Sequence, residues 1–398
     1  MSNANEPSTD QTIALALSGG GARAMAFHLG CMRALKDRGL LQRVAVLSTV
    51  SGGSVIGACW AYWDCDFDEF DKRITLLLRR GIQGSILWSA LFSVEALKIV
   101  ATLVVNAIPT ALMGVVRMGL RLLRRVLGIP TRFADQCLSQ LSRSLPIWGS
   151  LSTAFEHALR RQLFGQTKLG EVKRPNLEVA INACDLRTGT AFRFGSIASG
   201  GWRYGRVKHN DIAVAKAVAS SAAFPLLLPP LVERFEFERK GEVFRSQVVL
   251  TDGGVFDNLG VNVLEPGRDA AVSVNTHRVS HIISANAGAG QANGDGSPFW
   301  WLGRVAQSFE TVHRKVQDAA YGRLHRFVES GALQGFGMIY LGQMDERLPN
   351  RPADLVPRES VYQYPTDFAA MTQENLDALT QRGEQLAHAI IDRYLADL

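Results

Sequence analysis

Cysteine is scarce in this chain, and its few cysteines are poorly placed for cross-links. The 398 residues include five cysteines. An odd number without a Cys-x-x-Cys pair argues against a disulfide framework and against a zinc ribbon. No other cluster of metal-ligating residues stands out, so we expect no metal and no other cofactor. The cysteines are Cys31, Cys59, Cys65, Cys137 and Cys184.

The N-terminus lacks a basic segment followed by an apolar one, which is the pattern of a signal peptide. Residues 1–11 are polar, and we expect a flexible tail there, followed by one catalytic domain over residues 12–398. A reducing cytoplasm is the expected compartment. Only 20% of the residues are charged and 47% are hydrophobic, which is enough to bury a large core.

The chain carries little excess charge, +6 at pH 7. Much of it falls at Arg117, Arg121, Arg124 and Arg125, beside an apolar stretch and without interleaved aromatic residues. This arrangement favours a membrane surface as partner and argues against nucleic acid. The sequence does not indicate an oligomeric state.

Apolar runs alternate between strand and helix patterns at the start of the domain. Residues 12–17 and 44–47 are predicted strands, and residues 24–37 and 55–63 are predicted helices. This order predicts a three-layer α/β sandwich with a mainly parallel central sheet. Further predicted strands are 177–181, 191–194, 248–250, 271–274 and 338–341. Further predicted helices are 212–223, 309–328 and 376–395, with a mobile loop at 284–298, an apolar helical insertion at about 80–150 and a helical C-terminal part from about 300.

Small residues surround Ser51, where the second predicted strand turns into the second predicted helix. Gly52 and Gly53 follow it, whereas Thr49 occupies the first glycine position of Gly-x-Ser-x-Gly. That motif holds a nucleophilic serine on a sharp strand-to-helix turn. A serine hydroxyl also needs a base and a site for the oxyanion that it creates. A simple turn is the alternative.

The run Gly19, Gly20, Gly21 allows three interpretations. With Ala24 it fits a dinucleotide-binding fingerprint, but that fingerprint needs an acidic residue at the end of the second strand, and residues 47–50 contain none. Backbone amides of these glycines, placed at a helix N-terminus, could instead stabilise an oxyanion. A tight turn between strand and helix is the purely structural alternative.

Asp252 follows another predicted strand and precedes Gly253 and Gly254, so it is the candidate base. An aspartate that caps a turn is the alternative for this residue alone. Asp257 and Asn258 are expected to hold the loop that follows.

The histidines assemble no clear catalytic triad. His28 is expected to pack inside the first helix, while His277 and His281 follow a predicted strand end and stay open. His313 and Asp318 have the His-x-x-x-x-Asp spacing of some acyltransferases. We interpret that spacing as chance, because it lies in a charged helix with no glycine-rich site after it.

Taken together, these motifs resemble the patatin-like phospholipase family. The glycine loop with Arg23, the Ser51 turn, residues 219–225 and the run 252–260 occur in the family's order. The resemblance implies a Ser51–Asp252 dyad without histidine, with an oxyanion hole at Gly19, Gly20, Gly21 and Arg23. Gly52, Gly53, Gly253 and Gly254 would support these residues.

The implied activity is ester hydrolysis in phospholipids or lysophospholipids, of the phospholipase A or lysophospholipase type. An aspartate with a pKa near 4 is a weak base for a serine. We therefore predict that Asp252 is buried and within hydrogen-bond reach of Ser51. Acyl transfer by the same serine is one alternative. A membrane-docking protein with an impaired site, as Thr49 would allow, is another.

Residues 99–116 contain no charge and reach the length of about 18 residues that a membrane span needs. Pro109 and Asn106 interrupt the run. Because Ser51 and Asp252 must share one compartment, the chain between them cannot cross a membrane once. We expect residues 82–128 to form an interfacial or re-entrant element that docks the protein on a membrane and can cover the site. A helical subdomain packed against the core is the alternative.

Overall fold

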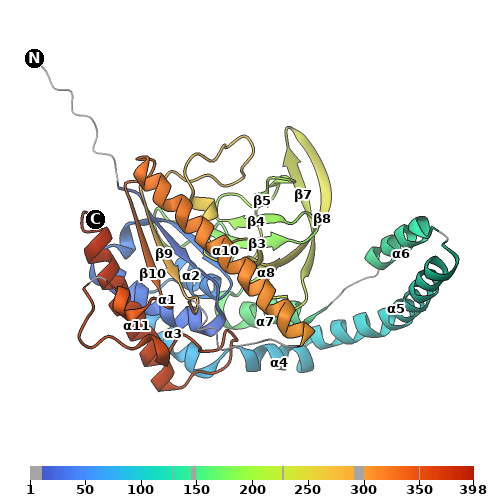
Figure 1. The fold of residues 1–398 in the computed structure, drawn as a ribbon, viewed down its shortest axis with the longest axis horizontal. Helices are drawn as coiled ribbons and strands as arrows, with labels where there is room; N and C mark the ends of the chain where they lie inside the picture. The colour runs from blue at the N-terminus through green and yellow to red at the C-terminus, as the bar shows by residue number, and fades with distance from the viewer. Residues whose placement is uncertain (1–10, 129, 145–148, 226–227, 291–299, 349) are drawn as a thin grey trace, which may run out of the picture.

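The computed structural model describes residues 11–128, 130–144, 149–225, 228–290, 300–348 and 350–398 (Figure 1). Its central feature is one sheet in the strand order β10-β9-β1-β2-β3-β4-β5-β6-β7-β8. The first five strands in this order are parallel and the others are antiparallel. The parallel strands are β1 (Ile13–Leu17), β2 (Val44–Val50), β3 (Glu178–Asp185), β9 (His281–Asn286) and β10 (Gly335–Tyr340). The antiparallel strands are β4 (Thr190–Gly195), β5 (Gly200–Gly201), β6 (Gly205–Val207), β7 (Leu231–Arg239) and β8 (Glu242–Asp252).

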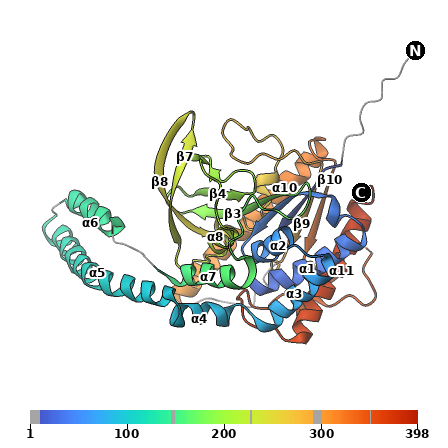
Figure 2. The same ribbon diagram turned by 180° about the vertical axis from the view of Figure 1, so that it is seen from behind.

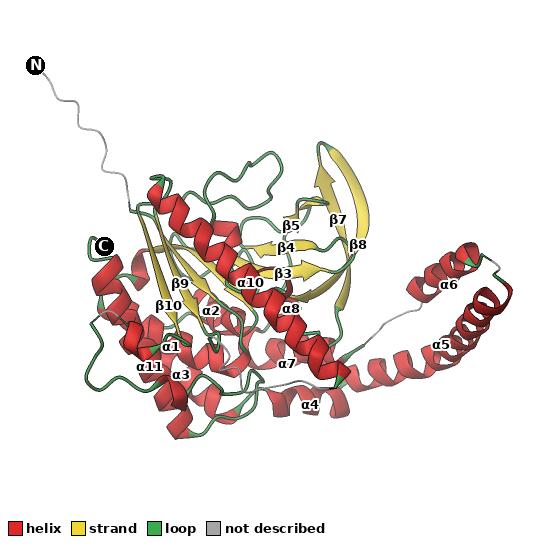
Figure 3. Ribbon diagram, viewed as in Figure 1, coloured by secondary structure: helices red, strands yellow, loops and turns green. Residues whose placement is uncertain are grey.

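Helices cover both faces of the sheet, as Figures 2 and 3 show. Alternate residues of β1 face opposite layers: Ile13, Leu15 and Leu17 join one buried cluster, and Ala14 and Ala16 join another. The fold is therefore the predicted three-layer sandwich, with a parallel half and an antiparallel half. The larger cluster includes helices α1 (Gly21–Asp37), α2 (Gly52–Tyr62), α3 (Phe67–Arg80), α7 (Leu151–Leu159), α8 (Val214–Ser221) and α11 (Gln373–Tyr394). The smaller cluster includes residues that follow α9 (Gly254–Asp257) and the C-terminal part of α10 (Trp301–Glu329).

Strand β3 is the junction between the two halves. Its residues 178–182 pair with the parallel strand β2, up to the pair Val50–Asn182. The next residue, Ala183, pairs with Asp252 at the end of the antiparallel strand β8. Strands β2 and β8 therefore approach each other end to end along β3, and the residues that follow β2 meet the last residue of β8.

The insertion forms an arm of helices that leaves the sandwich (Figures 1 and 2). It begins with α4 (Gln83–Phe92), whose Ile86 packs against the core, and continues in α5 (Val94–Leu127) and α6 (Arg132–Ser144), which extend away from the sandwich (Figure 1). Helix α5 continues through Pro109. In the described part of the chain one helix, Val94–Val126, is apolar and long enough to span a membrane, with a mean hydropathy of 2.1 and 12% of its most apolar stretch buried.

Two local predictions were wrong. Residues 271–274 form a turn instead of a strand, because Asp269 captures local amides: its carboxylate accepts from Ala271 and its carbonyl from Val272 and Ser273. The predicted loop at 284–298 begins inside β9, whose last residues are Ser284, Ala285 and Asn286. These small residues resemble a loop in composition, but they are buried between two neighbouring strands.

Some predictions fall on residues that are not described. The predicted tail lies almost entirely in residues 1–10, and much of the predicted loop lies in residues 291–299, so both fall outside the described residues.

Candidate active site

Ser51 lies on the turn between β2 and α2 with a strained backbone. Its φ is 52° and its ψ is −120°, a region that residues with a side chain rarely adopt. The adjoining Gly52 touches the backbone of Gly21, since a Cβ at position 52 would lie 2.2 Å from the Gly21 carbonyl oxygen. Only glycine allows this approach. The turn therefore presents Ser51 beside the glycine loop of α1, as a nucleophile elbow does.

Thr49 departs from the elbow motif, and Gly57 one turn into α2 compensates for it. A Cβ at position 57 would lie 2.5 Å from Cγ2 of Thr49. The methyl group of Thr49 thus occupies the space that a side chain at position 57 would need. The Thr49 hydroxyl lies 3.0 Å from Oγ of Ser54. The elbow motif has a glycine at the position of Thr49. In this chain Gly57 leaves the space that the Thr49 side chain needs.

Replacing Gly57 by alanine is expected to destabilise the protein by about 1–3 kcal/mol, because it overpacks this contact. The displaced elbow should also lower ester hydrolysis by about 10- to 100-fold. The double variant Thr49→Ser/Gly57→Ala removes the opposing methyl group and should recover both properties. Thermal denaturation and a kinetic assay measure the two effects.

Gly322→Ala is the matched control, because a Cβ in the middle of α10 meets no atom within 4 Å. It should leave activity unchanged. A Gly57→Ala variant as stable as wild type, or one that Thr49→Ser does not rescue, would show that the two side chains do not compete for this space.

Ser221, the last residue of α8, fixes the elbow from behind. Its Oγ accepts a hydrogen bond from the Ser51 amide at 3.0 Å. Its hydroxyl donates to the Asn182 carbonyl oxygen on β3 at 2.6 Å. Ser54 Oγ lies 2.9 Å from Oγ of Ser221. Sequence reasoning gave Ser221 no role beyond its place in the motif at 219–225, since these contacts are made across the fold.

Asp252 lies at the end of β8 and is 3% exposed. Its Oδ1 accepts from the Gly254 amide at 2.7 Å, and the carboxyl also interacts with the Ser51 side chain, which lowers its pKa. Burial raises the pKa of Asp252 to about 6, and the hydrogen bonds from Ser51 and Gly254 oppose that rise. The expected burial of Asp252 is therefore confirmed, and the Ser51–Asp252 dyad stays a prediction.

The glycine loop presents backbone amides next to Ser51. Among the described backbone hydrogen bonds, Ala22 donates to the Asp367 carbonyl and Ala24 to that of Gly20, and none begins at Gly20 or Gly21. The first amides of a helix have no partner within the helix, and they carry its positive end. Gly19 instead donates to the Asn258 carbonyl, at 3.1 Å. Gly20 and Gly21 are therefore better placed than Gly19 to bind an oxyanion.

Arg23 ties the glycine loop to the C-terminal part of the chain. The guanidinium donates to the carbonyl oxygens of Tyr362 at 3.3 Å and of Tyr364 at 2.9 Å. It is 9% exposed, and burial lowers its pKa to about 10. These carbonyls belong to the segment that also contains Asp367, whose carbonyl accepts from the Ala22 amide. The Arg23 side chain therefore helps to hold the glycine loop against that segment.

The histidines lie in three different environments. His28 is buried, its Nε2 lies 2.9 Å from the Ser18 carbonyl oxygen, and burial lowers its pKa to about 4, so it packs in neutral form as expected. His281 begins β9 opposite Ile13, at the far end of the sheet from Ser51, and His277 Nδ1 lies 2.8 Å from Glu178. His313 is different. It lines the cavity above Asp252, its Nδ1 lies 3.4 Å from Nε2 of Gln317, and its ring stacks on Phe309.

A cavity of about 560 Å³ opens above Ser51 and Asp252. Its apolar wall comes largely from α4, α7 and the segments after α8 and before α11. Its polar wall comes from one face of α10, where residues 310, 313, 314 and 317 follow helical spacing. The apolar residues are Ile86, Leu87, Leu151, Phe224, Leu228 and Phe368, and the polar ones on α10 are Glu310, His313, Arg314 and Gln317. The sequence interpretation missed this polar wall, and helical spacing was its only signal.

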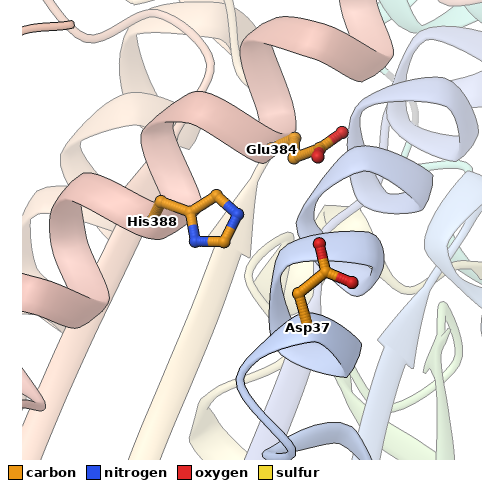
Figure 4. A group of neighbouring side chains, drawn as sticks. All are labelled: Asp37, Glu384 and His388. Carbon is orange, nitrogen blue, oxygen red and sulfur yellow. The ribbon is translucent and has the colours of Figure 1, made fainter.

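Within the described residues, one group of three side chains could hold a metal ion: Asp37, Glu384 and His388 (Figure 4). Their ligand atoms lie within 4.8 Å of one another. However, Arg38 donates to Nδ1 of His388 at 3.3 Å, which places a positive charge beside the group. The group also lies at the end of α1 opposite to Gly21, so it takes no part in the arrangement around Ser51.

Comparison with known proteins identifies the family. A model of the patatin-like phospholipase family matches residues 15–264, which is more than half of the chain. A search of curated proteins finds no match.

Solved structures are similar at low identity. Human GIVD cytosolic phospholipase A2 shares 12% identity with a TM-score of 0.52, over 98% of this chain and 62% of that one. VipD from Legionella pneumophila shares 15% identity with a TM-score of 0.39, over 97% of this chain and 67% of that one. The human structure supports the fold alone. The family match and the fold agree, and the chain belongs to the patatin-like phospholipase family, a family of lipid-ester hydrolases.

Proposed function

We propose that this protein hydrolyses the carboxylic ester bonds of phospholipids or lysophospholipids, with Ser51 as nucleophile and Asp252 as its base. One observation carries the proposal: Ser51 and the buried Asp252 line the same cavity and interact, and the pKa of the Asp252 carboxyl is raised to about 6. Relative to an ordinary aspartate, this shift strengthens the base by about two pKa units and still leaves it mostly ionised at pH 7.

The reaction then proceeds in two halves. Ser51 Oγ attacks the ester carbonyl carbon while its proton passes to Asp252, and the tetrahedral intermediate forms. The intermediate collapses as Asp252 returns the proton to the leaving alkoxide, which departs as an alcohol, and an acyl-serine remains. Asp252 next takes a proton from water, the hydroxide attacks the acyl carbon, and the proton goes back to Ser51 as the fatty acid leaves.

The negative charge of each tetrahedral intermediate needs donors that are already in place. The amides of Gly20 and Gly21 supply them from the N-terminus of α1, and the amide of Gly52 lies on the first turn of α2 beside Gly21. Two helix N-termini thus converge on the carbon that Ser51 attacks. Amides fixed in a site that excludes water stabilise an oxyanion strongly, because they need no reorganisation during the reaction.

The cavity fits an amphipathic substrate. Leu87, Leu151, Leu228 and Phe368 offer an acyl chain an apolar wall, while the charged face of α10 suits a polar head group. We further propose that the exposed apolar helix α5 holds the protein at a membrane, where such substrates reside. Its segment from 99 to 127 carries four arginines and no acidic residue, which suits anionic lipid.

A fluorophosphonate probe tests the reaction class. We expect the purified protein to be labelled, and mass spectrometry of its peptides to find the adduct on Ser51. Product analysis on mixed phospholipid vesicles should then show free fatty acid. A folded protein that reacts with neither probe nor lipid would contradict the proposal, and acyl appearing on an added alcohol in preference to water would show acyl transfer.

A further inference from the structure

The first half of α10 carries an exposed apolar stripe that no described element covers. Its large apolar side chains follow the helical spacing i, i+4, i+8, i+11, i+15, so they share one face. Just before the helix, Trp300 is 80% exposed. The stripe consists of Trp301, Val305, Phe309, Val312 and Val316, with exposed fractions of 63%, 58%, 39%, 64% and 43%. The second half of the same helix is different, since Ala320 and Leu324 are buried against the sheet.

A second exposed apolar surface lies on the arm. On α4 and the start of α5, several large apolar side chains are about half exposed or more, namely Leu87 (58%), Trp88 (52%), Phe92 (67%) and Leu97 (72%). In both ribbon views the N-terminal end of α10 lies beside the junction of α4 and α5 (Figures 1 and 2). Two surfaces far apart in the sequence therefore adjoin in the fold.

The two surfaces meet at the rim of the active-site cavity. Three large apolar residues both line the cavity and are exposed to solvent: Leu87 of α4, Leu151 of α7 and Phe309 of α10. The apolar surface is thus continuous with the apolar wall above Ser51. Isolated exposed apolar residues are normal on a soluble protein, but a contiguous surface of this kind marks an interaction site.

The charges and residue types indicate which partner covers it. The end of α5 adds Arg121, Arg124 and Arg125, and the stripe of α10 is flanked by Arg304. Tryptophans at one end of an apolar face, with arginines along its margins, are typical of an element that lies in the interface of an anionic bilayer. This composition favours a lipid surface over a second copy of the chain.

We infer that the first half of α10 is a second membrane-contacting element, and that α10 and the arm together seat the rim of the cavity on an anionic lipid surface. This inference rests on the proposed function, because access of lipid to the cavity matters only if the protein hydrolyses lipid esters. The binding experiment that tests it does not require hydrolysis. An ester-bearing lipid leaving the bilayer would then pass between Leu87 and Phe309 without crossing water.

Vesicle binding without turnover tests the inference. In a Ser51→Ala background, the variant Trp301→Ser/Val305→Ser is compared with the control Trp202→Ser/Val243→Ser, whose residues are 46% and 49% exposed on the antiparallel half of the sheet. Sedimentation uses vesicles of phosphatidylcholine and phosphatidylglycerol. We expect the α10 variant to partition at least about 10-fold more weakly, because two large apolar groups are lost, and the control to bind as its parent does.

Turnover separates this inference from the proposed function. With Ser51 present, the α10 variant should hydrolyse vesicle lipid more slowly and a soluble short-chain ester at the wild-type rate. If the α10 variant binds vesicles as tightly as its parent, the inference is overturned. It is also overturned if the wild-type protein is a dimer, the α10 substitutions dissociate that dimer, and vesicle binding is unchanged. If the wild type binds vesicles but cleaves neither ester, the proposed function fails and the binding comparison still decides the role of α10.

Discussion

Replacing Ser51 by alanine is expected to lower ester hydrolysis by about 10⁴-fold or more, to the background of the assay, because no other hydroxyl lies against the Asp252 carboxylate among the described contacts. The variant should fold normally, since the amide that bonds to Ser221 is unchanged. Activity on vesicle lipid, covalent labelling and thermal denaturation would be measured together.

Ser51→Gly makes this prediction sharper. Glycine adopts a φ of 52° and a ψ of −120° without strain, whereas alanine does not. Both variants should be inactive, but the glycine variant should be more stable than the alanine variant by about 1 kcal/mol or more. Hydrolysis by either variant within 100-fold of wild type would show that Ser51 is not the nucleophile.

Replacing Asp252 by asparagine should have opposite effects on activity and stability. An amide cannot accept the serine proton, so hydrolysis should fall by about 10³-fold or more. The wild type should lose activity about tenfold per pH unit below pH 6, as the carboxylate becomes protonated. The residual rate of the asparagine variant should lack this pH dependence.

The stability effect follows from the raised pKa of Asp252. In the folded protein the carboxyl binds its proton more tightly than in the unfolded chain, with a pKa of about 6 against 3.8. The stability that this proton contributes is complete below pH 3.8 and is lost as the pH rises through 6. At neutral pH the ionised carboxylate therefore lowers stability, by up to about 3 kcal/mol.

Asp252→Asn removes that cost, so the variant should unfold at a higher temperature than wild type at pH 8. The difference should vanish near pH 4, where the wild-type carboxyl is protonated as well. Urea unfolding at the two pH values measures both free energies of unfolding. Asp257→Asn is a control for a partly buried carboxylate outside the proposed catalytic pair. A variant that is equally destabilised at both pH values would show that Asp252 acts mainly as a structural hydrogen-bond acceptor.

Much of the site could be predicted from the sequence because its backbone needs are local. A strand that ends in glycines and begins a helix predicts a tight turn with free amides, at Gly20 as at Ser51. Asp252 could be chosen because it ends a strand and precedes two glycines. These patterns depend on neighbouring residues only, and a single sequence contains them in full.

The features that the sequence did not predict depend on contacts between distant elements. The departure at Thr49 looked like an impaired motif, because nothing in the sequence links its methyl group to Gly57. His313 was dismissed because its surroundings in the chain are charged, whereas its surroundings in space are Phe309 and the backbone of Gly254. The strand ending in Ser284, Ala285 and Asn286 was missed because burial between neighbouring strands, not composition, makes it a strand.

The end-to-end approach of β2 and β8 along β3 makes the proposed catalytic pair independent of the length of chain between its two residues. The pairs Val50–Asn182 and Ala183–Asp252 set the distance from the elbow to the carboxylate, so loops in between can lengthen freely. The arm of helices is one such extension. The same arrangement makes the rate of hydrolysis depend on the pairing register between β8 and β3. If β8 paired with β3 one residue out of register, the Asp252 side chain would face the opposite layer of the sandwich. Refolded protein with that slip would therefore keep its secondary structure and lose hydrolysis.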